Sequence, residues 1–345
     1  MAETGAIARG RDAPRHGPAP RGRTRVGGAP EGTHSVPGDD REVDRRLHGL
    51  TVPMVLGPTA IGKSRVAMAI ARALGGEIVV CDSRQVYRGL EVLSNQPGPE
   101  ERQEVRHHLV GMVDPGCVFN VFHFVEAARS AMVAIAERGR VPVIEGGTLL
   151  WADALARGFS LGDVPPRPER RAELERLTVA ELAALARRLD PDLDVDVRNP
   201  VRLIRAIEVL EVAGPPLSRL RRRHPPSWRP VKIGLTADLA VLDRRIEERV
   251  RGQMDRGLIE EVAAALAAGV PAGAPALTGI GAMEARAHLE GRRSREEVAR
   301  AIVRADRRYA RRQLRWLRRD PDVNWFDATA DPVPGILEFL RERVR

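Results

Sequence analysis

The segment that decides the fold is Gly57-Pro58-Thr59-Ala60-Ile61-Gly62-Lys63-Ser64, which has the Gly-x-x-x-x-Gly-Lys-Ser spacing of a phosphate-binding loop. A strand-like apolar run over residues 52–56 precedes it, and a helix-like run over residues 65–74 follows it. The glycines let backbone N–H groups surround an anion, the helix adds its positive N-terminal end, Lys63 adds a charge, and Ser64 offers a hydroxyl to Mg²⁺. A chance glycine-rich turn does not explain this spacing between a strand and a helix. The sequence therefore predicts that the chain binds a diphosphate or a triphosphate.

The composition predicts one large domain, one smaller domain and an anionic partner. At 345 residues the chain can bury a sizeable core. Lys and Arg total 56 against 47 Asp and Glu, which gives a net charge of +9, and almost all of the basic residues are arginine. Arginine pairs with phosphate in a bidentate way and stacks on bases, so we expect a nucleic-acid partner. Scattered arginines also follow from a GC-rich genome with no function attached, so only clustered arginines carry this argument.

The cysteines and the apolar runs predict a cytoplasmic protein with no membrane contact. Cys81 and Cys117 are too few for a disulfide framework or a four-ligand zinc site, as expected in a reducing cytosol. No apolar run approaches the roughly 20 residues that a membrane span needs, and the N-terminus lacks the apolar core of a signal peptide.

Residues 1–47 are predicted to be a disordered basic extension. They are rich in Gly, Pro, Arg and acidic residues and have almost no apolar periodicity, so they cannot bury enough surface to offset their ordering entropy. A basic arm for RNA and a spacer or over-extended gene start are both open interpretations, and the second is favoured.

The rest of the chain alternates strands and helices, which predicts an α/β fold with a P-loop NTPase-like parallel sheet, flanking helices and an inserted small helical domain. The predicted strands cover residues 52–56, 77–81, 141–145, 231–235 and 323–326, and the predicted core helices lie at 63–74, 121–138, 238–268 and 294–319. Proline-rich stretches at 165–168 and 225–226 bracket a segment with two further helices, 169–177 and 180–189. The core is therefore predicted over 48–160 and 229–345, and the helical insertion over 161–228.

Polar residues follow the second and third predicted strands, at the edge where parallel sheets bind ligands. Asp82 comes directly after the second strand and is well placed for chemistry, although an Asp there also caps a following helix. Thr148 follows paired glycines and can hydrogen-bond a ligand, although an ordinary strand-to-helix turn has the same pattern. His107 and His108 do not share a face of a helix or strand, so we assign them a structural or substrate-positioning role and no transition metal.

Two sets of arginines recur at helical spacing. Arg245 and Arg249 lie four residues apart and share a helix face, where they can neutralise a leaving diphosphate or belong to an exposed face with Glu partners. Near the C-terminus a denser set, interleaved with Tyr309 and Trp316, can hold a phosphate backbone with salt-dependent affinity. This set, called here the arginine stripe, consists of Arg304, Arg308, Arg311, Arg315 and Arg318.

Eight segments, in order between residues 53 and 326, resemble the bacterial tRNA dimethylallyltransferase (isopentenyltransferase) family. They are GPTAIGKS, DSRQVYRGL, HHLV, FNVFHF, GGTLLW, RLIRAIEV, RRIEERVRGQMDRGLIEEV and RRYARRQLRWLRRD. Members of this family hold dimethylallyl diphosphate in the phosphate loop and transfer its prenyl group to the exocyclic amine of the adenosine 3′ of a tRNA anticodon. The resemblance implies the same reaction here, on tRNAs that read codons beginning with U, with Mg²⁺ as cofactor and a monomeric enzyme.

The resemblance also implies roles for individual residues. Lys63, Ser64 with Mg²⁺, and Arg249 would stabilise the departing diphosphate, with the whole loop from Gly57 to Ser64 around it. Asp82 would accept a proton from the adenine amine, once the base has left its stack at a cost of roughly a few kcal/mol. The helical insertion would grip the anticodon stem-loop. Besides Asp82, the candidate tRNA-binding residues are Ser83, Arg84, Gln85, Thr148, Arg171, Arg202, Arg205 and, from the arginine stripe, Arg308 and Arg311.

The chain departs from the family pattern mainly on the acceptor side. The departures are Gln96 in place of a loop lysine, Leu149-Leu150-Trp151 in place of Gly-Leu-Tyr, Ala282 in place of Tyr, and Asp306 in place of the Thr of a Thr-Arg motif. The insertion is also shorter by about one or two helical turns. We expect the missing lysine to weaken phosphate or tRNA affinity.

Three alternative functions stay open because of these departures. Prenylation of a free adenine nucleotide is one, although relatives of that kind are generally shorter. A small-molecule kinase shares the loop and fold but does not explain the DSRQVYRG segment. The third alternative is an RNA-binding paralogue without catalysis. The presence together of Lys63, Ser64, Asp82 and Arg249 argues against it.

Overall fold

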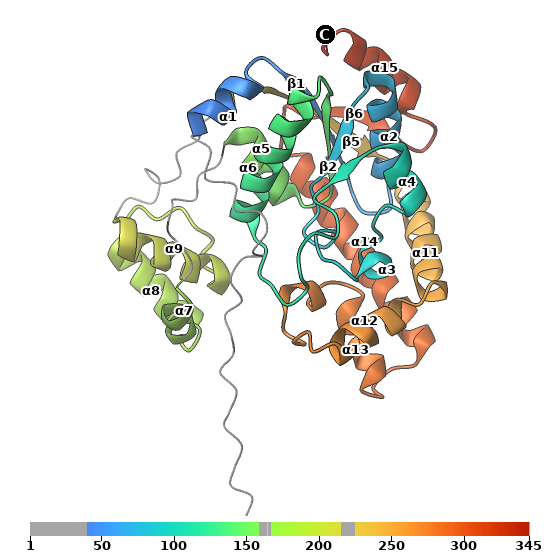
Figure 1. Ribbon diagram of the computed structural model, residues 1–345. Coiled ribbons are helices and arrows are strands. Elements are labelled where there is room, and N and C mark those ends of the chain that lie inside the picture. The colour runs from blue at the N-terminus through green and yellow to red at the C-terminus, as the bar shows by residue number, and fades with distance from the viewer. Residues whose placement is uncertain (1–39, 159–163, 165–166, 215–224, 345) are drawn as a thin grey trace, which may run out of the picture. The chain divides into compact units, whose positions relative to one another are not determined.

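A sheet of six parallel strands organises the described residues, 40–158, 164, 167–214 and 225–344, of this computed structural model (Figure 1). The strands are β1 (Thr51–Leu56), β2 (Glu77–Val80), β3 (His107–His108), β4 (Pro142–Gly146), β5 (Arg229–Thr236) and β6 (Asn324–Asp327). Their order across the sheet is β3-β2-β4-β1-β5-β6, so the phosphate loop that follows β1 lies near the middle of the carboxyl edge. The predicted parallel α/β fold is confirmed, and β3 is the one strand among them that was not predicted.

Helices cover both faces of this sheet. Helix α2 (Lys63–Leu74) packs on β1, β2 and β4, with α15 (Val333–Arg341) against it, while α5 (Val121–Glu137) and α6 (Leu149–Arg157) pack together on the other face (Figure 1). The remaining core helices are α3 (Glu91–Ser94), α4 (Pro99–Glu104), α11 (Leu239–Asp255), α12 (Leu258–Ala267), the 3₁₀ turn η1 (Pro275–Leu277), α13 (Ala282–Leu289) and α14 (Arg295–Leu317). None of the helices in the described ranges is both long and apolar enough to span a membrane.

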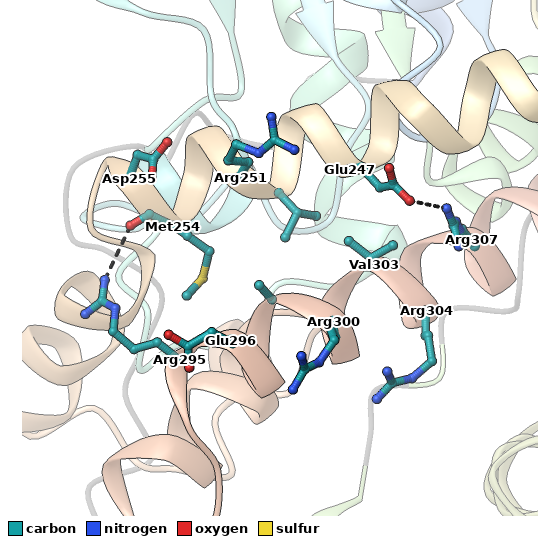
Figure 2. A pocket seen from close by; sticks show the side chains of 12 residues that line it. Glu247, Arg251, Met254, Asp255, Arg295, Glu296, Arg300, Val303, Arg304 and Arg307 are labelled. Carbon is teal, nitrogen blue, oxygen red and sulfur yellow. Dashed lines mark hydrogen bonds and ion pairs between the residues drawn. The ribbon is translucent and has the colours of Figure 1, made fainter.

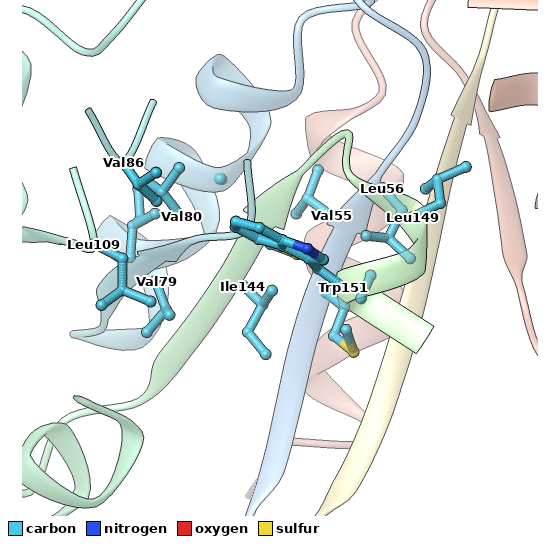
Figure 3. Close-up of a cluster of buried hydrophobic side chains, with 14 of the residues drawn as sticks. Val55, Leu56, Val79, Val80, Val86, Leu109, Ile144, Leu149 and Trp151 are labelled. Carbon is cyan, nitrogen blue, oxygen red and sulfur yellow. The ribbon is translucent and has the colours of Figure 1, made fainter. Parts of the chain in front are cut away.

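The core lies between the sheet and these helices. Strands β1, β2 and β4 are buried along almost their whole length, as expected for parallel strands covered on both faces. Trp151 of α6 lies over the strands together with Ile144, Val55 and Val80 (Figure 3). Its ring stacks on Phe124 of α5 with centroids 4.7 Å apart, so the aromatic pair joins the two helices to the sheet. This packing fixes the strand ends that carry the polar residues described below.

Residues 40–47 form a helix, α1 (Asp40–Leu47), that the sequence did not predict. Leu47 is fully buried in the main core, and the Asp44 carboxylate accepts a hydrogen bond from Arg129 Nη2 of α5 at 2.9 Å. The predicted disordered extension 1–47 is therefore wrong for residues 40–47, because Leu47 is buried in the core and the ion pairs of Asp44 with Arg129 and of Arg46 with Glu137 join this short helix to α5. Residues 1–39 lie outside the described residues.

A separate apolar core holds the helices of the predicted insertion. They are α7 (Pro168–Leu174), α8 (Val179–Leu189) and α9 (Pro200–Ala213), of which α9 was not predicted. Leu174, Leu182 and Leu203 meet in the centre of this small core. Trp228 instead is buried in the main core, so the main core begins before the predicted boundary at residue 228. The other predicted boundary, at residue 161, lies outside the described residues.

Candidate active site

The phosphate loop connects β1 to α2. Gly62, at the N-cap of α2, has φ of 99°, a conformation that glycine adopts without steric cost, and no side chain caps the first turn of the helix. The N–H groups of this turn therefore remain available to an anion. Lys63 Nζ donates to Pro58 O of the loop at 3.0 Å, and Ser64 is exposed at the helix start. The loop has the geometry that its sequence predicts for binding phosphate groups.

Glu145 is a functional candidate that the sequence reasoning missed. It lies on β4 opposite Val55 of β1 and is only 5% exposed, yet Ser64 Oγ donates to its Oε1 at 3.4 Å. Burial raises the pKa of Glu145, and the nearby Lys63 opposes this rise. Burial also lowers the pKa of Lys63, against the pull of the Glu145 and Asp82 carboxylates. A lone carboxylate at the end of an apolar strand beside the loop strand was the available signal.

Asp82 and Thr148 lie at the ends of the neighbouring strands β2 and β4. Asp82 is half-buried, and its Oδ1 accepts from Arg84 N at 2.8 Å, so it does cap the turn that follows β2. Its carboxylate also acts on the pKa of Lys63, which shows that it lies near the loop as well. Thr148 Oγ1 accepts from Ser83 N at 2.9 Å and donates to Ser83 Oγ at 3.3 Å. The structure therefore joins these two predicted segments into one wall beside the phosphate loop.

Glycine is required where these two strand ends meet. A Cβ on Gly146 would overlap the carbonyl oxygen of Cys81. Cys81 N donates to Glu145 O at 2.6 Å, which continues the β2–β4 ladder to this point. The close approach of these two backbone segments fixes the position of Asp82 relative to the phosphate loop.

One face of α14 closes the site over the strand ends. Tyr309 Oη donates to Gly147 O at 3.3 Å, and burial raises the pKa of Tyr309 to about 12, with Asp82 adding to the rise. Gln313 is 3% exposed; its Nε2 donates to the same carbonyl at 2.8 Å, and its Oε1 accepts from Thr59 N at 2.9 Å. A single amide thus ties the phosphate loop to the end of β4.

Replacing Gln313 by Ala is expected to destabilise the protein by about 1–3 kcal/mol, because Thr59 N–H and Gly147 C=O would lose this partner. Urea unfolding at constant pH measures the change. Arg308→Ala is the matched control, because Arg308 is exposed on the same helix and its removal should change the free energy of unfolding by less than about 0.5 kcal/mol. Equal unfolding midpoints for the two variants would contradict the bridging role.

Both arginines of the predicted pair on α11 contact the phosphate loop. Arg249 Nη1 donates to Thr59 Oγ1, and its Nη2 donates to Asp306 Oδ2 of α14 at 2.6 Å. Arg245 Nη1 donates to Ile61 O at 3.3 Å, and its Nη2 reaches a carbonyl after β6. The interpretation of an exposed helix face with Glu partners is therefore wrong for both, because the pair faces inward. The charge of Arg249 lies beside the loop, where an anion would bind.

Arg84 and Gln85 lie on the turn after β2. Arg84 Nη1 donates to Pro275 O of η1, which holds its guanidinium near Gly279, between η1 and α13. Gln85 is half-buried, and its Oε1 has no hydrogen-bond partner within the described part of the chain. An orphan acceptor of this kind is available to a donor group of a ligand.

The paired histidines have a structural role. His107 and His108 form the short edge strand β3, where His107 Nδ1 is 2.7 Å from Val105 O. His108 Nε2 lies 2.7 Å from Glu77 Oε2, which also accepts from Arg138 Nη2 at 2.7 Å. Both imidazole rings therefore make structural contacts at the edge of the sheet.

The three arginine candidates of the insertion divide into two kinds. Arg171 Nη2 donates to the fully buried Glu208 at 2.6 Å, and Arg205 Nη2 donates to Val164 O at 2.9 Å, so both are used inside the insertion. Arg202 is exposed on α9. The Arg205 guanidinium also lies 5.7 Å from the centre of the Phe122 ring of α5, which connects the insertion to the core.

The arginine stripe lies on the side of α14 away from the phosphate loop. Arg308 and Arg315 are exposed, whereas Arg311 Nη2 pairs with Asp243 of α11 at 3.0 Å. Next to this pair, α11 and α14 leave a groove of about 530 Å³ whose rim carries Arg300 and Arg304 (Figure 2). Neither Asp82 nor any residue of the phosphate loop lines this groove.

Comparisons with known proteins decide the family. The IPP transferase family matches residues 85–320. The tRNA dimethylallyltransferase of Thermomicrobium roseum is 42% identical over 299 residues, which cover 85% of this chain and 90% of that protein. The chain belongs to the IPP transferase family. Among solved structures, the tRNA isopentenylpyrophosphate transferase of Bacillus halodurans is 34% identical, with a TM-score of 0.64 over 85% of this chain and 95% of that one.

A eukaryotic dimethylallyltransferase solved in action on tRNA has the same fold, with a TM-score of 0.73 over 86% of this chain and 80% of that one at 20% identity. The IPP transferase fold thus extends to this more distant protein. The predicted resemblance to the family over residues 53–326 is confirmed: the family match covers residues 85–320, and two tRNA dimethylallyltransferases each match over 85% of the chain.

Positions at which this IPP transferase departs from the family pattern are well packed. Gln96 Nε2 donates to Tyr87 O at 2.8 Å, and its Oε1 accepts from Arg102 at 2.8 Å. Leu149 is 7% exposed, and Ala282 at the start of α13 is fully buried. These residues therefore make their own hydrogen bonds or packing contacts within the fold.

Proposed function

We propose that this IPP transferase transfers a dimethylallyl group from dimethylallyl diphosphate to the exocyclic amine of the adenosine 3′ of the anticodon, in tRNAs that read codons beginning with U. The observation that carries the proposal is the convergence of three groups at the carboxyl edge of the sheet: the phosphate loop, Arg249 that donates to Thr59, and Asp82 beside Thr148. Relatives named tRNA dimethylallyltransferase support the substrates.

In the proposed reaction the amine nitrogen of adenine attacks the allylic carbon of the donor. The carbon–oxygen bond to diphosphate breaks, and its electron pair leaves with the diphosphate. Asp82 accepts the proton that the amine gives up, as a general base. Lys63, Arg249 and the N–H groups of the loop stabilise the charge that develops on the leaving group. The Arg249 and Lys63 charges count for more here than in water, because both groups are partly buried.

The residues beside Ser64 suit Mg²⁺. Ser64 Oγ lies 3.4 Å from Glu145 Oε1, and hydroxyl and carboxylate oxygens are ligands that this ion prefers, together with phosphate oxygens of a substrate. In the proposal Ser64 holds the ion and Glu145 orients the Ser64 hydroxyl. The bound ion would neutralise part of the diphosphate charge.

Recognition of the acceptor involves residues at the carboxyl edge of the sheet and the insertion. Ser83, Arg84 and Gln85 line the turn after β2, and the orphan Gln85 Oε1 is proposed to accept from the flipped base. Of the insertion arginines, the exposed Arg202 is the one proposed to meet RNA phosphates directly, while Arg171 and Arg205 shape the insertion. The proposal places this activity in the cytoplasm, where tRNA is found, and in a monomer.

The other functions considered from the sequence are not favoured. A kinase or an enzyme for free adenine nucleotides has no named counterpart among the relatives described above, which are tRNA-modifying enzymes. The test is to incubate the protein with tRNA, Mg²⁺ and dimethylallyl diphosphate labelled in its prenyl group. The proposal expects label in the RNA and one diphosphate released per prenyl group transferred. A parallel incubation with ATP tests the kinase alternative: ATP consumption there, with no labelled RNA in the first incubation, would instead assign a kinase.

Neutralising Arg308 and Arg315 together, as Gln, is expected to flatten the salt dependence of tRNA binding. Removing one phosphate contact lowers the slope of log affinity against log salt by about 0.7–0.9, so the slope of the double variant should fall by up to about 1.8. Filter binding across a salt series measures the slope. Arg293→Gln with Arg341→Gln is the matched control, since both are exposed arginines away from the arginine stripe. An equal slope in the two double variants would make the stripe a solvated face.

A further inference from the structure

Arg249 has protein partners on both of its terminal nitrogens. Nη1 donates to Thr59 Oγ1 of the phosphate loop, and Nη2 donates to Asp306 Oδ2 at 2.6 Å. Its Nε is buried and has no partner within the described residues. The guanidinium is therefore shared between the loop that would bind an anion and a carboxylate of α14.

Burying the carboxylate charge of Asp306 at this position is energetically unfavourable. Its residue surface is 4% exposed, and burial raises the pKa of its carboxyl, which Arg249 opposes and Glu284 of α13 reinforces. A diphosphate bound to Arg249 would bring further negative charge toward the same buried carboxylate, and like charges at a desolvated contact weaken binding. A neutral residue at this position would carry no such charge.

We infer that Asp306 competes with diphosphate for the Arg249 guanidinium and so sets how weakly the site holds the diphosphate of donor and product. The inference rests on the proposed function. Before diphosphate binds, Asp306 neutralises Arg249, and on binding the diphosphate takes over part of that hydrogen-bonding capacity. The consequence is a looser complex with donor and a faster release of product diphosphate than a neutral residue would allow.

The experiment compares wild-type protein with Asp306→Asn and Asp306→Thr. Calorimetric titration with inorganic diphosphate and Mg²⁺ is expected to give a Kd about tenfold lower in both variants, equivalent to about 1.4 kcal/mol. The KM for dimethylallyl diphosphate should fall with it, while kcat does not rise. Because two different neutral replacements are compared, the test stays valid if one of the variants folds poorly. Thermal unfolding reports whether each variant is folded.

The pH dependence separates competition from a structural effect. Protonation of Asp306 removes the competing charge, so the wild-type affinity for diphosphate should improve relative to Asp306→Asn as the pH falls. The charged or titratable groups that face Asp306 are Arg249 of α11, Glu284 of α13 and Tyr309 of its own helix. A constant ratio of the two affinities at every pH would contradict a titrating competitor.

The matched control is Asp243→Asn, which removes another carboxylate that bridges α11 and α14 through Arg311. It should leave the affinity for diphosphate unchanged. Equal or weaker diphosphate binding in Asp306→Asn overturns the inference, because Asp306 would then only position Arg249. Tighter binding in a protein that transfers no prenyl group to any RNA overturns the proposed function and leaves the inference standing.

Discussion

Asp82→Ala is expected to lower kcat for prenyl transfer by about 100- to 10,000-fold, the range that general-base catalysis contributes. Asp82 stands at the end of β2, where its carboxylate acts on Lys63 and lies in the turn joined to Thr148 through Ser83. Removing it deprives the adenine amine of a proton acceptor while the phosphate loop and the arginine stripe stay intact. Single-turnover transfer with saturating tRNA measures the loss, and filter binding should show that the variant still binds tRNA.

Asp82→Asn is the sharper form of this test. Asn keeps an oxygen that can accept from Arg84 N, so the turn after β2 retains its cap, yet it cannot take a proton. The two variants should therefore lose similar activity, although Asp82→Ala should also be the less stable. Turnover of Asp82→Asn within a few-fold of wild type would remove Asp82 from the proton transfer and leave it as a cap.

Arg249→Ala is expected to lower kcat/KM for dimethylallyl diphosphate by about 100- to 1,000-fold, comparable to the loss of one preorganised donor to a developing anion. The guanidinium reaches both Thr59 of the loop and Asp306 of α14, so its removal takes away the arginine charge nearest the loop threonine. Steady-state kinetics with donor varied at saturating tRNA measure the effect.

A second variant separates the loss of donor use from an effect on protein stability. Arg249→Ala leaves Asp306 as a buried unpaired carboxylate, which destabilises proteins by several kcal/mol. Combining it with Asp306→Asn removes that charge, and the double variant should recover stability without recovering donor use. Arg244→Ala, an exposed neighbour on α11, is the control for the helix itself. Normal donor kinetics in the stable double variant would exclude Arg249 from diphosphate binding.

The parts of the fold that local pattern determines were predictable. The phosphate loop, five strands and the helices beside them follow from apolar runs and glycine spacing, and parallel strands bring the ends of β1, β2 and β4 to one edge. Helix α1 and strand β3 were not predictable in this way. Each is short and is stabilised by contacts with distant segments, such as the pair of Asp44 with Arg129.

The parts of the candidate site that lie at the strand ends were predictable. The contacts that α14 makes over the site were not. Thr59 and Gln313 are 254 positions apart, and only the packing of α14 over the loop brings them together. The same packing pairs Asp306 with Arg249, although the sequence had already marked Asp306 as unusual. Pattern alone also treats all members of the arginine stripe alike, whereas Arg311 is paired with Asp243 and Arg308 is exposed.

The most direct test of the account is the acceptor specificity of prenyl transfer. The protein is incubated with Mg²⁺ and labelled dimethylallyl diphosphate, and with one of three acceptors: an anticodon stem-loop with adenosine 3′ of the anticodon, the same loop with guanosine there, or free AMP. The account predicts label on the adenosine loop alone, and loss of that label in Asp82→Asn. Label on AMP alone, or on none of the three, would contradict it.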